Sequence, residues 1–364
     1  MAYISFQPSE YFNTKIYTQS GGANNGATQT ISLADVGFTW IKNRSYANSY
    51  CAFDTIRGGN GSECLMHLNT NAGAQGSDVD SAEGVTFGAS STTIGTDGGG
   101  YGYNNRDGDN YVAWSWRTGT TSGLSGGTIT PTAYSINTTS GVGMYRYNGT
   151  SSAGTIAHGL GVAPECVLVK KISAADSWWM YHRNTHSDVT TSNQYYTVLD
   201  TTVARNTNSG AWNNTTPTDT LIHVGDAGNT NSSSGSSSYI MYAFASKKGF
   251  SKMGGYVGNS NADGTFVYTG FRPSMLITKK ASGTAHWYQW DDKRIGYNPS
   301  NYILFPADNA VEDAGATERI DFLNNGFKFR HTDSDHNGSG QDYIYLAFAE
   351  FPLVSSNSKA GVAR

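Results

Sequence analysis

The chain has 364 residues, a formal net charge of -4 and only 14% charged residues. This length exceeds one ordinary hydrophobic core and predicts two or three structural units. No Lys/Arg cluster stands out, which excludes an electrostatic nucleic-acid binder. No apolar run reaches the roughly 20 residues of a membrane-spanning helix, and residues 1–11 lack a signal-peptide pattern. We therefore expect a soluble protein made in a cytoplasm, without membrane insertion.

Aromatic residues make up 13% of the chain, with 23 Tyr and 8 Trp beside 44 Gly. A disordered chain lacks that apolar content. The apolar segments are short, rich in Val, Ile and aromatic residues, and bounded by Gly, Asn, Asp and Ser, which is typical of strands and turns. No segment shows a sustained helical period. The sequence therefore predicts an all-β protein.

The predicted strands recur in three copies along the chain. A strand with a shared lysine lies at 41–45, 169–173 and 278–282. Aromatic residues follow that lysine at two shared offsets, as Tyr50 and Phe53, Trp178 and Tyr181, and Trp287 and Trp290. A closing strand that begins with tyrosine lies at 111–116, 239–244 and 343–348. The spacing from the lysine to this tyrosine is the same in the first two copies and shorter in the third, so the copies form an internal repeat.

Each copy also opens with a short strand-like run, which contains Tyr17, Tyr147 or Tyr268. The predicted units are 1–124, 125–258 and 259–364. Such units are longer than the 20–50 residues of a solenoid repeat, so each is expected to be a domain. Many short strands with frequent turns predict three tandem β-sandwich repeats of the jelly-roll or concanavalin-like type. The closing strand of the third copy is apolar at successive positions, which predicts a strand covered on both faces or one with a face at a domain contact.

The motifs of the three copies resemble a family of repeated domains in structural proteins of marine tailed phages. The motifs that carry the resemblance are 36–45 and 53–58 in the first copy, 158–164 and 212–214 in the second, and 264–273 and 347–350 in the third. The first copy departs from the pattern because no proline precedes its lysine strand. The resemblance covers nearly the whole chain. It implies a place on the virion surface and a concanavalin-like sandwich, and it brings no catalytic residue.

The sequence shows no catalytic constellation, so we expect a protein that is not an enzyme. The 8 histidines are scattered among polar loops. His182 and His186 have a spacing found in zinc sites, but no helix or intervening glutamate supports one. Asp54, His182 and Asp291 occupy the same repeat position. A position that changes from Asp to His and back is expected to be a strand-end or turn group and not a general acid.

One loop resembles the start of a calcium-binding loop. Asp333, Asp335 and Asn337 place oxygen atoms at alternating positions before Gly338. An EF-hand needs a bidentate glutamate at its twelfth position, where this chain has Ile344. A polar hairpin loop is the default interpretation, with Ca2+ as the alternative, and no other cofactor is expected.

The three cysteines, Cys51, Cys64 and Cys166, are expected to be buried thiols, with a Cys51–Cys64 disulfide as the alternative.

The aromatic clusters after the shared lysine allow two interpretations. They could stack on sugar rings at a glycan-binding site, or they could pack in the core. Successive strand residues point to opposite faces, so about half of them must be core. The candidate glycan-binding residues are Trp178, Trp179, Tyr181, Trp287, Tyr288 and Trp290.

Two functions follow from the sequence. The first is a tail-fibre or spike component that contacts host-surface polysaccharide and other virion proteins. The second is a capsid decoration or fibre protein that makes only protein contacts. A polysaccharide depolymerase is a minor third alternative, since it needs a carboxylate pair that the sequence does not show. The resemblance favours a homo-oligomer, with a trimer preferred.

Overall fold

The computed structural model describes residues 6–20, 28–59, 63–75, 84–95, 103, 106–232, 236–315 and 317–351. Over these residues the chain is all-β, as predicted. Its helical segments are short: η1 (Pro8–Glu10), η2 (Ser192–Gln194), α1 (Ser209–Trp212), α2 (Gly228–Asn231) and α3 (Ser334–Asn337). None of the helices in this described part is long and apolar enough to cross a membrane.

Three large antiparallel sheets carry the same central strand order. The first contains β1 (Phe12–Thr18), β8 (Asn110–Arg117), β3 (Val36–Asn43), β4 (Cys51–Asp54) and β5 (Met66–His67). The second contains β9 (Ala133–Asn137), β10 (Val142–Asn148), β17 (Ser238–Phe244), β12 (Cys166–Lys171), β13 (Trp179–His182), β14 (Tyr195–Val198) and β15 (Asn206–Thr207). The third contains β18 (Ser251–Val257), β24 (Asp342–Phe348), β20 (Met275–Lys280) and β21 (Trp287–Asp291). In each sheet the closing strand lies between the opening strand and the lysine strand.

A small sheet covers one face of each large sheet and completes a sandwich. The small sheets are β2 (Gln29–Ile31), β7 (Thr92–Ile94) and β6 (Val85–Phe87), then β11 (Gly154–Ala157) and β16 (Leu221–Val224), then β19 (Phe266–Tyr268), β23 (Gly326–Phe329) and β22 (Ile320–Leu323). Each small sheet shares a separate hydrophobic cluster with its large sheet. We refer to each large sheet with its small sheet as a unit.

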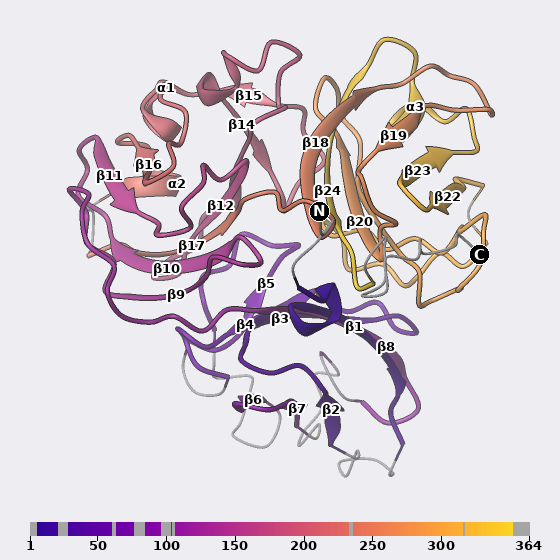
Figure 1. Cartoon of the computed structure of the whole chain (residues 1–364), viewed down its shortest axis with the longest axis horizontal. Helices are drawn as coiled ribbons and strands as arrows, with labels where there is room; N and C mark the ends of the chain where they lie inside the picture. The colour runs from indigo at the N-terminus through magenta and orange to yellow at the C-terminus, as the bar shows by residue number, and fades with distance from the viewer. Residues whose placement is uncertain are drawn as a thin grey trace.

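The three units also share one central core. Figure 1 shows them as three lobes around the middle of the molecule, in indigo to purple, magenta to pink, and orange to yellow. The inner faces of all three large sheets contribute to one cluster that includes Trp116, Phe244 and Phe348. The rings of Phe244 and Phe348 are 5.8 Å apart, and that of Trp116 lies 5.4 Å from Phe348. All three closing strands are thus buried on both faces, which the sequence predicted for the third copy.

Strand register corrects one predicted boundary. A stacked tyrosine pair joins the opening and closing strands of each unit, as Tyr17 with Tyr111, Tyr147 with Tyr239, and Tyr256 with Tyr343. The third opening tyrosine is therefore Tyr256 on β18, not Tyr268. Because β18 pairs with β24 over its full length, the boundary predicted after residue 258 falls one strand too late.

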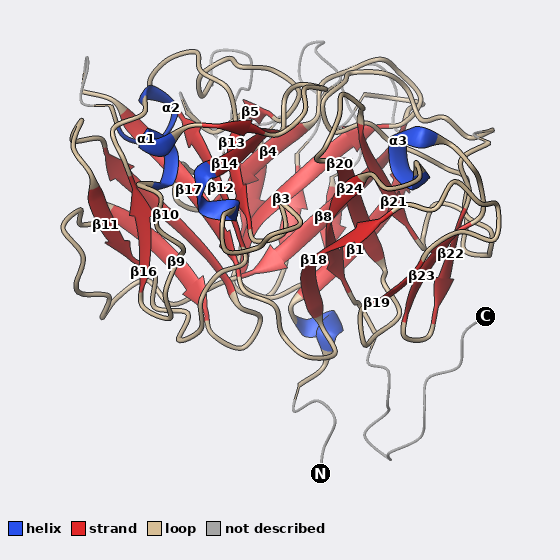
Figure 2. Ribbon diagram, turned by 90° about the horizontal axis from the view of Figure 1, so that it is seen from above, coloured by secondary structure: helices blue, strands red, loops and turns tan. Residues whose placement is uncertain are grey.

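Backbone hydrogen bonds connect the units in a ring. The residue two positions after the shared lysine accepts from the neighbouring unit each time, with Ala74 N–H donating to Ile172 O, Arg205 N–H to Ala281 O and Glu312 N–H to Arg44 O at 2.9–3.0 Å. Turned by 90°, the molecule has α1, α2 and α3 near one face and η1 near the opposite face (Figure 2). The three repeated units therefore form a closed ring and not a linear row of separate domains.

Candidate functional site

The six aromatic residues predicted as glycan-binding candidates are buried. None of them is more than 7% exposed. Trp178 and Trp287 belong to the central core, Trp179 and Tyr181 to the core of the second unit, and Tyr288 and Trp290 to that of the third. These strands are covered on both faces, so the glycan-binding interpretation is wrong for these residues and the packing interpretation holds.

The shared lysine is a junction residue between units. Each ammonium group donates to a backbone carbonyl of the neighbouring unit, as Lys42 to Asn309 at 3.3 Å, Lys170 to Asn71 at 3.0 Å and Lys279 to Thr202 at 3.2 Å. Burial lowers the pKa of Lys42 and Lys170 to about 8 and that of Lys279 to about 7. This strongest sequence motif therefore marks contacts between units.

The repeat position occupied by Asp, His and Asp lies at strand ends, as expected. Asp54 ends β4 and accepts from Arg57 Nε at 2.7 Å and from the Tyr242 hydroxyl at 2.6 Å. Asp291 ends β21 and forms a fully buried ion pair with the arginine three positions later. His182 ends β13, and burial lowers its pKa to about 4. Both of its ring nitrogens contact backbone atoms, so they are not directed toward His186.

The predicted calcium loop folds into the helical turn α3. Asp333 is its N-cap and accepts the N–H of Asp335 at 2.6 Å, while the carboxylate of Asp335 accepts from the Tyr288 hydroxyl at 3.0 Å. The Asn337 amide is buried and donates to the carbonyls of Asn261 and His331. The three side chains contact different partners, so Asp333, Asp335 and Asn337 do not form the predicted calcium set together. The three cysteines are free and buried, without the alternative disulfide.

A surface groove of about 390 Å³ lies between the second and third units. Its size is in the range of small-molecule sites. The second unit contributes Glu165, Arg183 and Asn184, and the third contributes 252–256, 266–268 and Tyr345. We call this the β18–β19 groove, because the edge strands β18 and β19 form its two sides.

The groove exists because the outer edge of β18 is open. In the second unit, β9 pairs with the corresponding opening strand β10. Among the described residues, no strand pairs with the outer edge of β18. Two side-chain hydrogen bonds link β18 to β19 and to the residue before it, with Lys252 Nζ donating to Tyr268 O at 2.8 Å and Thr265 Oγ1 to Val257 O at 2.9 Å. The third unit therefore has a gap where the second has a strand.

Two exposed aromatic rings line this groove. Tyr268 is 55% exposed and Phe266 is 45% exposed, on either side of the buried Val267. Residues at i and i+2 of a strand share a face, so both rings lie on the outward face of β19. The ammonium of Lys252 lies over the Tyr268 ring, 5.4 Å from its centroid, and so covers one face of this ring. Sequence reasoning missed this pair, although aromatics on both sides of one valine signal an apolar outward face.

Polar groups of the second unit lie beside these rings. Arg183 and Glu165 form a loose ion pair with 3.8 Å between Nη1 and Oε1, and Glu165 also accepts from the Ser246 hydroxyl. A Cβ on Gly255 would lie 2.8 Å from the Cβ of Asn184, so glycine permits this close approach of the units. The described lining holds a single carboxylate, Glu165, together with guanidinium, ammonium and amide donors.

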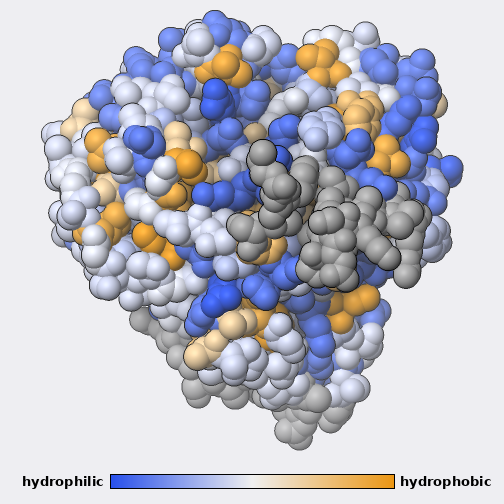
Figure 3. All heavy atoms as spheres, viewed as in Figure 1, coloured by the Kyte–Doolittle hydropathy of each residue, from blue (hydrophilic) through white to orange (hydrophobic). Residues whose placement is uncertain are grey.

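A second hollow of about 360 Å³ lies between the first and second units. Its lining is Asp35, 117–120 and 137–139, with an Arg117–Asp35 ion pair at 2.8 Å. This lining contains no aromatic residue. Elsewhere, hydrophobic residues form small, separated patches on the face in Figure 3. Of these two hollows, the β18–β19 groove is the one that combines exposed rings with polar groups.

The fold and the groove define a class of protein, an all-β protein of three sandwich units around a common core with a groove at one junction. Residues 7–352 match the model of a domain of unknown function, DUF7483, so the chain belongs to the DUF7483 family. This match runs through all three large sheets as one domain. No curated protein and no solved structure matches the chain.

Proposed function

We propose that this protein is a non-enzymatic component of a phage particle surface, of the tail-fibre or spike type, that binds host-surface glycans in the β18–β19 groove. The proposal of glycan binding rests on the pair of exposed rings, Phe266 and Tyr268. These rings lie beside the polar side chains of Arg183, Glu165 and Asn184. The particle-surface part rests on the resemblance of the repeated motifs to phage structural proteins.

The groove suits a sugar because a pyranose has two kinds of surface. Its C–H face is apolar and stacks on aromatic rings, while its hydroxyls need hydrogen-bond donors and acceptors. The groove offers both within one hollow of about 390 Å³. A glycoside hydrolase uses two carboxyl groups across the scissile bond. The single carboxylate of the described lining therefore favours binding over cleavage.

The test is a binding measurement with the purified full chain on a glycan array and on host-surface polysaccharide. We expect Tyr268→Ala to weaken binding about tenfold, since losing one stacked ring removes roughly 1 kcal/mol or more. Tyr297→Ala is the matched control, because Tyr297 is 65% exposed and lies outside the groove lining. Equal binding by both variants, or no glycan binding by the wild-type chain, would overturn the glycan proposal.

The open edge of β18 supports a second candidate, a protein that makes only protein contacts in the virion. An unpaired edge strand presents backbone groups that a partner strand can bind. Labelling intact particles with antibodies and imaging them by electron microscopy distinguishes the two. Label on the tail supports the adsorption role, whereas label spread over the capsid supports decoration and contradicts the tail-fibre assignment.

A further inference from the structure

His336 is a buried polar side chain without a partner. It is 0% exposed, and neither ring nitrogen has a hydrogen-bond partner among the described residues. Aromatic rings surround it, with Tyr288 at 4.1 Å and Trp290 at 5.5 Å between centroids. Buried polar groups are nearly always bonded, so an unpartnered imidazole needs a specific explanation.

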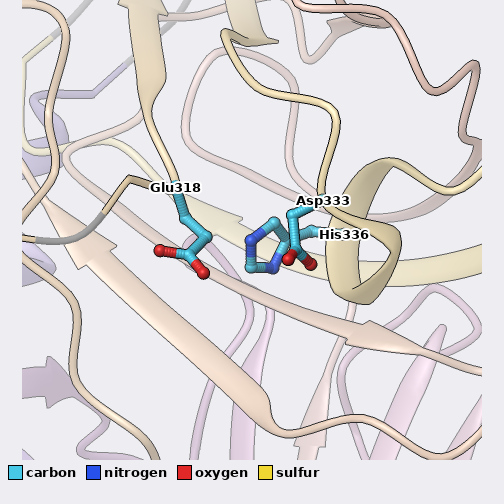
Figure 4. Close-up of side chains that lie close together, drawn as sticks. All are labelled: Glu318, Asp333 and His336. Atoms are coloured by element: carbon cyan, nitrogen blue, oxygen red, sulfur yellow. The ribbon is translucent and has the colours of Figure 1, made fainter.

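Two carboxylates lie next to this imidazole. One ligand atom each from Glu318, Asp333 and His336 can be chosen so that all three lie within 4.8 Å of one another. Figure 4 shows the ring of His336 between the carboxylates of Glu318 and Asp333. Asp333 and His336 are three positions apart at the start of α3, so the helical turn brings them to one side. Glu318 arrives from the segment that precedes β22.

The second unit provides an internal comparison. The opening-strand tyrosine bonds a carbonyl of the helical turn in both units, Tyr147 to Thr230 O and Tyr256 to His336 O, so Thr230 corresponds to His336. The N-cap of α2 is Ala227, where α3 has Asp333. The hydroxyl of Thr230 is satisfied by protein carbonyls. The turn itself therefore needs neither a histidine nor an aspartate at these positions.

We propose that Glu318, Asp333 and His336 form a site for a divalent transition-metal ion of the zinc type. Such ions accept one imidazole nitrogen and two carboxylate oxygens as protein ligands and leave a fourth position for water. In a tetrahedral site with metal–ligand bonds near 2.1 Å, the ligand atoms are about 3.4 Å apart. The ligand atoms here lie within 4.8 Å of one another, so small side-chain rotations would bring them to that separation. Ca2+ and Mg2+ take oxygen ligands, so the imidazole selects against them.

The experiment uses the full chain, stripped of metal with a chelator and titrated with Zn2+ by calorimetry, with bound metal counted by mass spectrometry. We expect one Zn2+ per chain at this site, and Ca2+ in excess does not displace it. Glu318→Gln and Asp333→Asn each weaken Zn2+ binding about tenfold or more, since each removes one ligand charge. Because neither variant alters the buried imidazole, both remain informative if His336→Ala does not fold.

Asp226→Asn is the matched control. Asp226 is exposed and precedes α2 in the corresponding loop of the second unit, which has no histidine in its turn. This variant should bind Zn2+ like the wild-type chain. The proposal is overturned if the wild-type chain binds no Zn2+, if Ca2+ competes equally, or if Glu318→Gln and Asp333→Asn bind Zn2+ as tightly as Asp226→Asn. Glycan binding is measured separately, so failure of either proposal leaves the other intact.

Discussion

At the scale of single residues, the shared lysines connect the units through charge-assisted hydrogen bonds. Each ammonium group is removed from water and receives backbone carbonyls in exchange. Carbonyl dipoles compensate only part of the lost hydration of a cation, so burial shifts each lysine toward the neutral amine relative to a lysine in water. Burial is the largest cause of the lowered pKa of all three lysines. The same residues therefore link the units and make the stability of the folded chain depend on pH.

Lys279 should make stability rise with pH. Its pKa is about 7 in the folded chain and 10.5 ordinarily, so between these values the unfolded chain holds more protons and the free energy of unfolding increases with pH. Below pH 7 the lysine is protonated in both states. Urea unfolding at pH 7, 8 and 9 should show a smaller rise for Lys279→Met than for the wild-type chain.

Lys15→Met is the control, because Lys15 is partly exposed on β1 of the first unit and is not one of the charged groups that shift the pKa of Lys279. It should keep the wild-type rise. The range stops at pH 9 because the pKa values of the buried thiols Cys51 and Cys166 are raised, and thiols that ionise in the unfolded chain act in the opposite direction. Equal slopes for both lysine variants would contradict this account.

At the scale of elements, one buried asparagine holds each of the turns α2 and α3. The Asn231 amide donates to the carbonyls of Gly225 and Ser152, and its oxygen accepts the N–H of Thr150. Asn337 repeats this pattern, since its oxygen accepts the N–H of Asn259 at 3.1 Å. A helical turn of four residues is too short to be stable by itself. These side chains supply the bonds that fix the turns against the opening loops of their units.

Asn337→Ala should lower the free energy of unfolding by about 2–4 kcal/mol, because it leaves buried backbone groups without partners. Urea unfolding at neutral pH measures this change. Asn325→Ala should change the free energy by no more than about 0.5 kcal/mol, since Asn325 is exposed in the hairpin loop between β22 and β23. A comparable loss for the two variants would show that the Asn337 amide does not hold the turn.

At the scale of the whole molecule, the three units share too much apolar surface to be independent. The central core draws on the inner faces of all three large sheets. Removing one unit would expose the aromatic side chains of the other two. Trp178 Nε1 of the second unit donates to His67 O of the first, and Trp287 Nε1 of the third to Val198 O of the second, both at 2.9 Å. The units therefore stabilise one another in a ring.

We expect the full chain to unfold in one cooperative transition, because the central core cannot be lost from one unit alone. Differential scanning calorimetry should give equal calorimetric and van't Hoff enthalpies. Asn337→Ala, which weakens the third unit locally, should shift this transition to lower temperature without dividing it. Two or three separate transitions would show instead that the units are independent domains.

The sequence by itself determined the all-β class, the lysine, aromatic and closing strands, and the burial of the third closing strand on both faces. These features depend on local patterning, because alternation and turn residues act over a few positions. The Asp, His and Asp position was also correctly expected at strand ends. The repeat could be recognised because equivalent strands face equivalent neighbours.

Only the tertiary structure decided which aromatic residues are exposed and which polar residues meet. Trp178 and Tyr268 have similar local sequence character, yet one lies in the central core and the other lines the groove. The difference arises because a third layer, the neighbouring unit, covers the inner face of each large sheet. Glu318 and His336 lie on either side of the β22–β23 hairpin in the sequence and meet only when it folds, so no local spacing signals the pair. Burial and juxtaposition depend on how the units close around the core, which no local pattern encodes.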